Sequence, residues 1–210
     1  MIFEKEFELH DFDSIVALTD TDITEEILDR CFEIDREFYE DSYYWNISEL
    51  RKAIKEFGQF CFVYIDKEER TLIGYSFWFP IKTDVFNEFI KKKEMLLDIK
   101  PEYCLKFRDS KEVNLFLGGE AFMSGYNIRE MHLAIEDLLQ RRILELMLSG
   151  IKVKYIAMES CCKYDEEFLL PKLRLSKSVK KDKSTFYYDE YSPDRSYTDS
   201  KYVTELKKYY

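Results

Sequence analysis

Residues 113–158 read VNLFLGGEAFMSGYNIREMHLAIEDLLQRRILELMLSGIKVKYIAM. The centre of this stretch has a helical pattern, which Gly150 is placed to end. β-Rich runs at 113–123 and 153–158 lie on either side of it. A strand, a long helix and a second strand predict a parallel crossover. The apolar residues of the helix form one stripe: Met131, Ile135, Leu138, Leu139, Ile143, Leu146 and Met147.

The rest of the chain adds strands and helices around this unit. Capping pairs predict two helices, one starting near Asp22 with Glu25 and one near Asn46 with Glu49. Strand patterns lie at 2–9, 60–65, 71–81 and 184–191, and a short helical pattern at 166–172. The lysines between 177 and 183 are typical of a solvated hairpin. This order predicts an α/β fold with a central mixed sheet flanked by helices.

We expect one domain at 1–191 followed by a tyrosine-rich tail at 192–210. Residues 84–108 carry a charged, helical pattern between the third and fourth predicted strands. They therefore read as a helical insertion lying over one end of the sheet. The tail is expected to pack against its own domain or to fray, although an interaction surface is an alternative.

Composition limits the partners. The formal net charge is −10, and an acidic surface repels both nucleic-acid phosphates and anionic membranes. No apolar run approaches the ~20 residues needed to cross a bilayer. The five cysteines lack a C-x-x-C pair, and the two histidines, His10 and His132, lack metal-ligand spacing. We expect reduced thiols, a cytoplasmic protein and no bound metal; the oligomeric state stays open.

Three stretches resemble one family when they are taken in order. They are the hairpin FVYI and LIGY at 62–65 and 72–75, the helix–strand unit at 134–158, and LLPKLRL at 169–175. Together with the order of elements they resemble the GNAT superfamily of acyl-CoA-dependent N-acyltransferases. The resemblance covers residues 20–80 and 113–191. It implies that strands 113–123 and 153–158 splay apart to admit a pantetheine arm.

The family places the motif Q/R-x-x-G-x-G/A before its long helix, where backbone N–H groups surround the CoA pyrophosphate. The matching residues here are Arg129 to Ala134, REMHLA. His132 replaces the first glycine, and its side chain must point away from the phosphates or clash with them. The resemblance implies acetyl-CoA as cosubstrate. The implied binding residues are Phe122, Met123, Arg129, Met131, His132, Leu133 and Ala134.

Two catalytic roles have candidate residues by the same resemblance. The family often uses a carboxylate on its fourth strand as general base. Glu120 follows Gly118 and Gly119, where a bulge would aim it toward the splayed gap; Glu112 is a second candidate, and an exposed strand glutamate is the simpler alternative. Leu170 stands where many members have a thiolate-protonating tyrosine, so Tyr164 is the candidate donor, with an aromatic packing role as the alternative.

Two functions follow from these observations. The first is transfer of an acetyl group from acetyl-CoA to a small-molecule or peptide amine. Arg129, Ala134 and the long helix favour this enzyme. The second is a GNAT-like binding or sensing module that has lost catalysis, which His132 and Leu170 favour.

Overall fold

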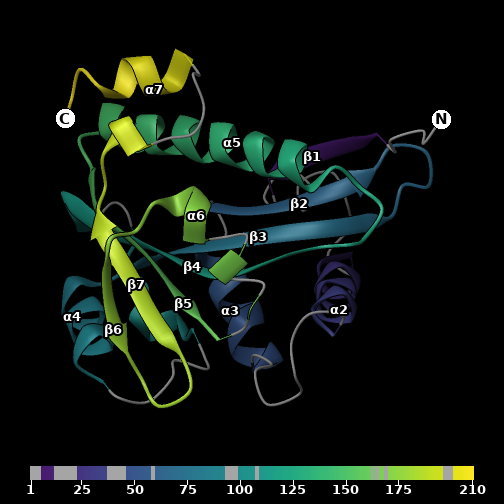
Figure 1. The fold of residues 1–210 in the computed structure, drawn as a ribbon, viewed down its shortest axis with the longest axis horizontal. Coiled ribbons are helices and arrows are strands. Elements are labelled where there is room, and N and C mark those ends of the chain that lie inside the picture. Colours follow the sequence, from purple (N-terminus) through teal and green to yellow (C-terminus); the bar gives the residue numbers. More distant parts are fainter. Residues whose placement is uncertain are drawn as a thin grey trace.

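The computed structural model describes residues 6–11, 23–36, 46–57, 60–92, 99–106, 109–161, 163, 166–167, 170–195 and 201–210. Within these residues, one seven-stranded sheet has the order β1-β2-β3-β4-β5-β7-β6 (Figure 1). The pair β4–β5 is parallel and the other neighbouring pairs are antiparallel. The strands are β1 (Phe7–Asp11), β2 (Cys61–Asp66), β3 (Leu72–Ile81), β4 (Glu112–Phe122), β5 (Lys152–Ser160), β6 (Lys177–Lys180) and β7 (Thr185–Glu190).

Helices cover both faces of the sheet (Figure 1). One face carries α5 (Ile128–Leu148), the short α6 (Leu170–Leu173) and α7 (Lys201–Leu206). The opposite face carries α2 (Ile23–Asp35), α3 (Ile47–Phe57) and α4 (Thr83–Lys91). Short 3₁₀ turns lie at Pro101–Tyr103 and Pro193–Arg195. The predicted mixed sheet and its flanking helices are confirmed.

Local sequence signals account for the start of α3 and the end of α5. The side chain of Asn46 accepts hydrogen bonds from the backbone N–H groups of Ser48 and Glu49, at 3.1 and 3.3 Å, as the capping pattern predicted. Gly150 follows α5 with a φ of +80°, which only glycine adopts readily. The predicted cap at Asp22 lies outside the described residues.

Two hydrophobic cores lie on the two faces of the sheet. Strand alternation sends one set of side chains toward α2, α3 and α4 and the other toward α5. The predicted stripe of α5 belongs to the second core, and five of its members are buried: Met131, Ile135, Leu139, Ile143 and Leu146. No described helix combines the length and apolar character that crossing a bilayer requires.

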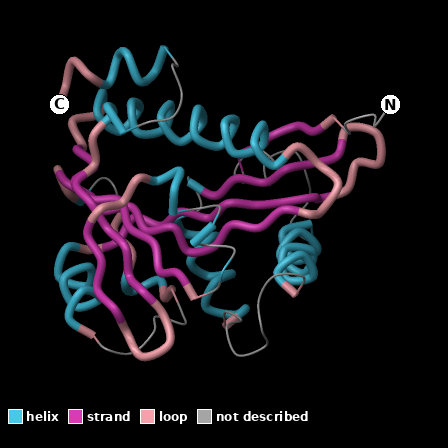
Figure 2. The backbone as a smooth tube through the Cα atoms, viewed as in Figure 1, coloured by secondary structure: helices cyan, strands magenta, loops and turns pink. Residues whose placement is uncertain are grey.

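The parallel strands β4 and β5 separate before they end. Their pairing runs from Glu112 opposite Lys152 to Leu117 opposite Met158. β4 nevertheless continues to Phe122 and β5 to Ser160. Figure 2 shows the result, with strands β1 to β4 extending toward the N-terminal side while β5, β6 and β7 turn downward. The predicted splay is confirmed.

The insertion and the C-terminal segment both pack on the domain. The insertion contributes α4, whose buried Phe86 and Phe89 join the first core. Leu206 of α7 is buried in the second core, and the Tyr210 hydroxyl donates to the carbonyl of Val153 at 2.7 Å. The lysine-rich hairpin is formed by β6 and β7, and Lys177, Lys180 and Lys183 are exposed as predicted, whereas Lys181 is buried.

Candidate functional site

A β-bulge in β4 sets the direction of Glu120. Leu117 pairs with Trp78 and Gly119 with Phe77, so Gly118 is the extra residue between two ladder partners. Leu117 belongs to the core beneath α5. Strict alternation from Leu117 would send Glu120 to the opposite face. The extra residue shifts the alternation by one, and Glu120 therefore faces α5.

Glu120 accepts hydrogen bonds on both carboxylate oxygens. His132 Nδ1 lies 2.8 Å from Oε1, and the Ser76 hydroxyl donates to Oε2 at 2.7 Å. Trp78 Nε1 in turn donates to the Ser76 oxygen at 3.0 Å. Glu120 is only 2% exposed, and a carboxylate this deeply buried is tolerated only when partners replace its water. These partners supply that replacement.

The surrounding core holds His132 in place. The Tyr64 hydroxyl donates to the backbone carbonyl of Met131, which ties the start of α5 to β2. The Phe122 ring meets the His132 ring edge to face, with centroids 4.9 Å apart. Phe122 can approach β3 because Gly74 lies beneath it; a Cβ on Gly74 would come within 2.6 Å of the Phe122 ring. Gly74, in the predicted sequence LIGY, therefore leaves room for the Phe122 ring that contacts His132.

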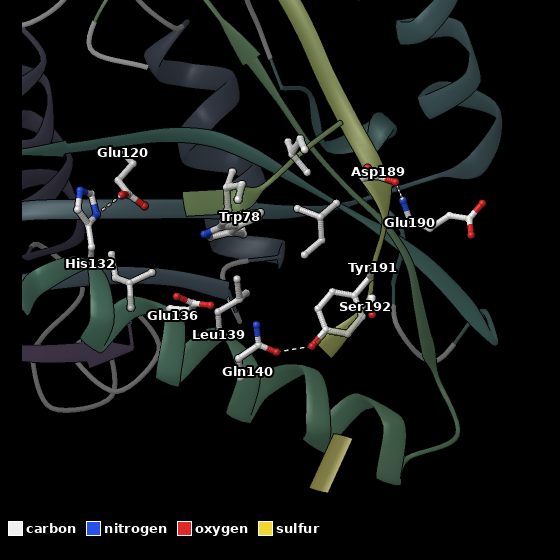
Figure 3. Close-up of a pocket in the computed structure, with 14 residues that line it drawn as sticks. Trp78, Glu120, His132, Glu136, Leu139, Gln140, Asp189, Glu190, Tyr191 and Ser192 are labelled. Atoms are coloured by element: carbon white, nitrogen blue, oxygen red, sulfur yellow. Dashed lines mark hydrogen bonds and ion pairs between the residues drawn. The ribbon is translucent and has the colours of Figure 1, made fainter. Parts of the chain in front are cut away.

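A cavity of about 60 Å³ opens beside the Glu120–His132 pair (Figure 3). Figure 3 shows this pair at one end, Tyr191 with Gln140 at the other, and Trp78 between them. The Tyr191 hydroxyl donates to the Gln140 side chain. The space is far below the roughly 300–1,000 Å³ of whole-ligand pockets, so it suits a small group. Its apolar wall is formed by Trp78, Ile135, Leu139, Ile156, Leu173 and Leu175.

The motif residues 129–134 lie inside α5 rather than in a loop before it. Asn127 caps the helix by accepting from the N–H of Glu130, and the N–H of Met131 bonds to the Asn127 carbonyl. In an α-helix each later N–H bonds four residues back, so the amides from His132 onward serve the helix itself. The backbone amides that remain available to bind an anion are therefore those of the first residues of α5.

The structure brings together only part of the predicted set. Four predicted residues are buried, and contacts to His132 join Glu120 and Phe122 to the start of α5: Glu120, Phe122, Met131 and His132. Met123 follows β4 and is half-buried, and its N–H bonds to the Ile73 carbonyl at 2.8 Å. The other motif residues point elsewhere: Arg129 and Leu133 are exposed, and Ala134 is half-buried. Tyr164 lies outside the described residues.

Sequence reasoning did not pair His132 with Glu120, and it missed Ser76 and Trp78 altogether. The two β3 residues lie at i and i+2, so they share a face of the strand. A serine and a tryptophan inside an otherwise apolar strand are the available signal, because each needs a hydrogen-bond partner when buried. The bulge at the double glycine is the signal that places Glu120 on that same face.

Comparison with solved structures defines the fold. The loading GNATL domain of CurA from Lyngbya majuscula superposes with a TM-score of 0.55 and 10% identity over 88% of this chain and 98% of that one. The structure of the NatC complex bound to Gag peptide and CoA gives 0.52 and 12% over 89% and 99%. Ard1 from Thermoplasma volcanium gives 0.51 and 11% over 89% and 98%.

The chain therefore has the GNAT fold, in agreement with the resemblance read from its sequence. Identities of 10–12% establish the architecture alone. No protein-family model matches the sequence, and no curated protein is significantly similar to it.

Proposed function

We propose that the protein transfers an acyl group, with acetyl as the first choice, from a CoA thioester to a small-molecule or peptide amine. The observation that carries the proposal is the separation of β4 and β5 beyond Leu117 and Met158, beside the cavity that Glu120 lines. A strand edge without its neighbour can hydrogen-bond an extended ligand such as a pantetheine arm. Backbone N–H groups there can polarise a thioester carbonyl. NatC, which shares the fold, was crystallised with CoA and a peptide.

The two parts of a CoA molecule meet different surroundings. The open edge of β4 fits the pantetheine arm. Carboxylates surround the start of α5, where the phosphates are expected: Glu130 lies in its first turn, and the Tyr126 hydroxyl donates to Asp66 at 2.5 Å. Like charge opposes phosphate binding, so the exposed Arg129 has to supply the phosphate contact.

The test combines binding and turnover. Wild-type protein is incubated with acetyl-CoA and a panel of amines and basic peptides, and released thiol and acylated amine are both measured. Thermal unfolding is followed with and without CoA; ligand at 100 times its Kd adds ~2.7 kcal/mol, which is several degrees for this size. Arg129→Ala should remove most of that shift, whereas Arg141→Ala, farther along α5, should keep it. If the protein showed no turnover and no thermal shift at millimolar ligand, the proposed enzyme function would be refuted.

A second function is favoured by a specific observation. The amides of residues 132–134 belong to α5, and the His132 side chain lies in the core where the family motif has glycine. Both features favour a GNAT-fold module that binds a ligand without transferring an acyl group. A CoA-dependent thermal shift without any acylated product across the amine panel would select this module.

The proposed proton donor to the leaving thiolate is Tyr164. Substitution and kinetics test this role. Tyr164→Phe should lower kcat and leave the CoA-dependent thermal shift intact, since the phenol is needed only when the C–S bond breaks. Tyr209→Phe, which alters an exposed tyrosine near the C-terminus, is the matched control. Equal kcat values for both variants would remove Tyr164 from the mechanism.

A further inference from the structure

The cavity of about 60 Å³ lies where β4 and β5 part, on the α5 face of the sheet (Figure 3). β5 lines it with Ile156, which precedes the last paired residue of that strand, Met158. β4 lines it with Glu120, which follows its own last paired residue, Leu117. The open edge of β4, which fits a pantetheine arm, therefore runs past this cavity. A group carried at the end of that arm lies next to it.

The polar side chains of the cavity wall are already engaged within the protein. Three carboxylate or hydroxyl groups have hydrogen-bond partners: Glu120 with Ser76, Asp189 with Ser176, and Tyr191 with Gln140. The Trp78 Nε1 also donates to Ser76. Most of the remaining wall is apolar. An alkyl group asks for no hydrogen bond, so it is the ligand chemistry that this wall accepts at the lowest cost.

The cavity is closed at the sheet and opens beside α6. Its inner apolar side chains are buried: Trp78, Ile135, Leu139 and Ile156. Leu173 at the end of α6 and Leu175 just after it are half-buried, and Glu190 is exposed. Exposure thus increases from the strands toward α6. A chain enters at Leu173 and Leu175 and ends against the strand residues.

The size of the cavity limits the length of that chain. A water-sized group needs ~10–15 Å³ of such volume. A methylene group is larger than water, so the cavity of about 60 Å³ takes no more than about four carbons. An acetyl group fills only part of this space, whereas a butyryl group fills it.

Resting on the proposed acyl transfer, we infer that this cavity is the subsite for the alkyl part of the acyl group. The preferred donor is then a CoA thioester with a straight acyl chain of about four carbons. Each additional buried methylene tightens binding about fourfold, so butyryl binds about 15-fold more tightly than acetyl. Acetyl-CoA remains a substrate, because the open edge of β4 holds its pantetheine arm in the same way.

The closing experiment compares donors of increasing chain length on the full-length wild-type protein. Calorimetric titration gives the Kd of CoA, acetyl-CoA, butyryl-CoA and octanoyl-CoA. Butyryl-CoA should bind about 15-fold more tightly than acetyl-CoA, and octanoyl-CoA, which exceeds the cavity, no more tightly than butyryl-CoA. The ¹³C-labelled terminal methyl of butyryl-CoA should show a nuclear Overhauser contact with the indole of Trp78, which lines the cavity.

Substitutions at the opening test the same subsite. Leu173→Phe narrows the entrance beside α6 and should remove most of the difference between butyryl-CoA and acetyl-CoA while the Kd of acetyl-CoA stays unchanged. Leu148→Phe, at a 64% exposed position at the end of α5, is the matched control and should keep the wild-type difference. If Leu173→Phe does not fold, the wild-type chain-length series and the methyl contact decide the question.

The possible failures are distinct. Equal Kd values for acetyl-CoA and butyryl-CoA, together with turnover of acetyl-CoA, would refute the subsite and leave the proposed function standing. Graded binding without any acylated amine would refute acyl transfer and support the subsite. A methyl contact to Trp78 from the acceptor butylamine, and none from butyryl-CoA, would assign the cavity to the acceptor and overturn the inference. No binding of any thioester would refute both.

Discussion

Two buried glutamates, one at each side of the splayed strands, are paired with side chains of different kinds. Glu120 and His132 join β4 to α5, at 2.8 Å and with side chains 3% and 9% exposed. Glu159 and Lys181 join β5 to the turn between β6 and β7, at 3.1 Å and with side chains 5% and 1% exposed. The first pair lines the cavity of about 60 Å³. The second lies beneath an open depression whose lining includes exposed residues such as Lys163 and Asp182.

The difference lies in the partner of each glutamate. Lysine and glutamate, as residue types, are both charged throughout the neutral pH range, so a pair of them fixes geometry. Two further hydrogen bonds fix the geometry around Glu159. The Ser184 hydroxyl donates to Glu159, and the Lys181 backbone N–H donates to the Ser184 carbonyl at 2.9 Å, which closes the turn. Histidine changes charge near neutral pH. A similar degree of burial thus holds a fixed charge, the Glu159–Lys181 anchor, in one place and a residue type whose charge can change in the other.

The largest expected effect comes from breaking the anchor. Lys181→Met should lower the free energy of unfolding by about 3–5 kcal/mol, because Glu159 would remain buried without its cation. Urea denaturation at neutral pH measures it. Lys180→Met, at the exposed neighbouring position, should stay within ~0.5 kcal/mol of wild type.

Removing both charges separates two explanations of that loss. The double variant Glu159→Leu with Lys181→Met should recover much of the stability, since an apolar pair of similar volume avoids the desolvation cost. If Lys181→Met alone were as stable as wild type, the buried pair would contribute nothing, and the contrast with Glu120–His132 would disappear.

An intermediate effect is expected on the side of the Glu120–His132 pair. Gly74→Ala would place a Cβ 2.6 Å from the Phe122 ring and 3.0 Å from the Ala121 carbonyl oxygen. Phe122 is fully buried, so the crowding should cost about 1–3 kcal/mol. Because Phe122 contacts His132, the His132 imidazole signals should move while the resonances of Lys181 stay in place.

The control for this substitution is Thr71→Ala, which alters an exposed residue just before β3 and should stay near wild type. Movement of the Lys181 resonances in Gly74→Ala would show that the two pairs are coupled through the sheet. The two pairs would then respond to a substitution together and not independently.

The sequence predicted the architecture because its strongest signals are local and periodic. The α5 stripe, Gly150 and the strands on either side of the helix fixed the crossover, and the glycines in β4 predicted the bulge. The start of α5 was not predicted, because the resemblance placed residues 129–134 before the helix, whereas the structure caps α5 at Asn127. The cap prevails physically, since it satisfies the amide of Glu130 locally.

The pairing of side chains was out of reach for a different reason. His132 and Glu120 are brought together by a one-residue shift in a strand and by the rotation of a helix, and both are tertiary choices. Lys181 was read as solvated for the same reason. Its partner Glu159 lies on another strand, so the spacing of the lysines in the hairpin does not indicate the pair.

The smallest effect should come from a neutral hydrogen bond at the far end of the cavity. Burial above all, with Tyr210 and Glu136 nearby, raises the pKa of Tyr191 well above its usual range. The hydroxyl therefore stays protonated and donates to Gln140. Tyr191→Phe should cost ~1 kcal/mol, the usual net contribution of such a bond.

The pH dependence of Tyr191→Phe sharpens the comparison with the two glutamate pairs. A group that binds its proton more tightly in the folded state stabilises the fold below its unfolded pKa, and this contribution declines as pH rises above that value. Tyrosine in an unfolded chain titrates near pH ~10. The stability gap between wild type and Tyr191→Phe should thus be constant from pH 7 to 9 and shrink above it. Urea denaturation across that range measures the gap. A gap that widens with rising pH would mean that the hydroxyl is ionised in the folded protein, and the far end of the cavity would then carry a charge that opposes the anionic side chains around it.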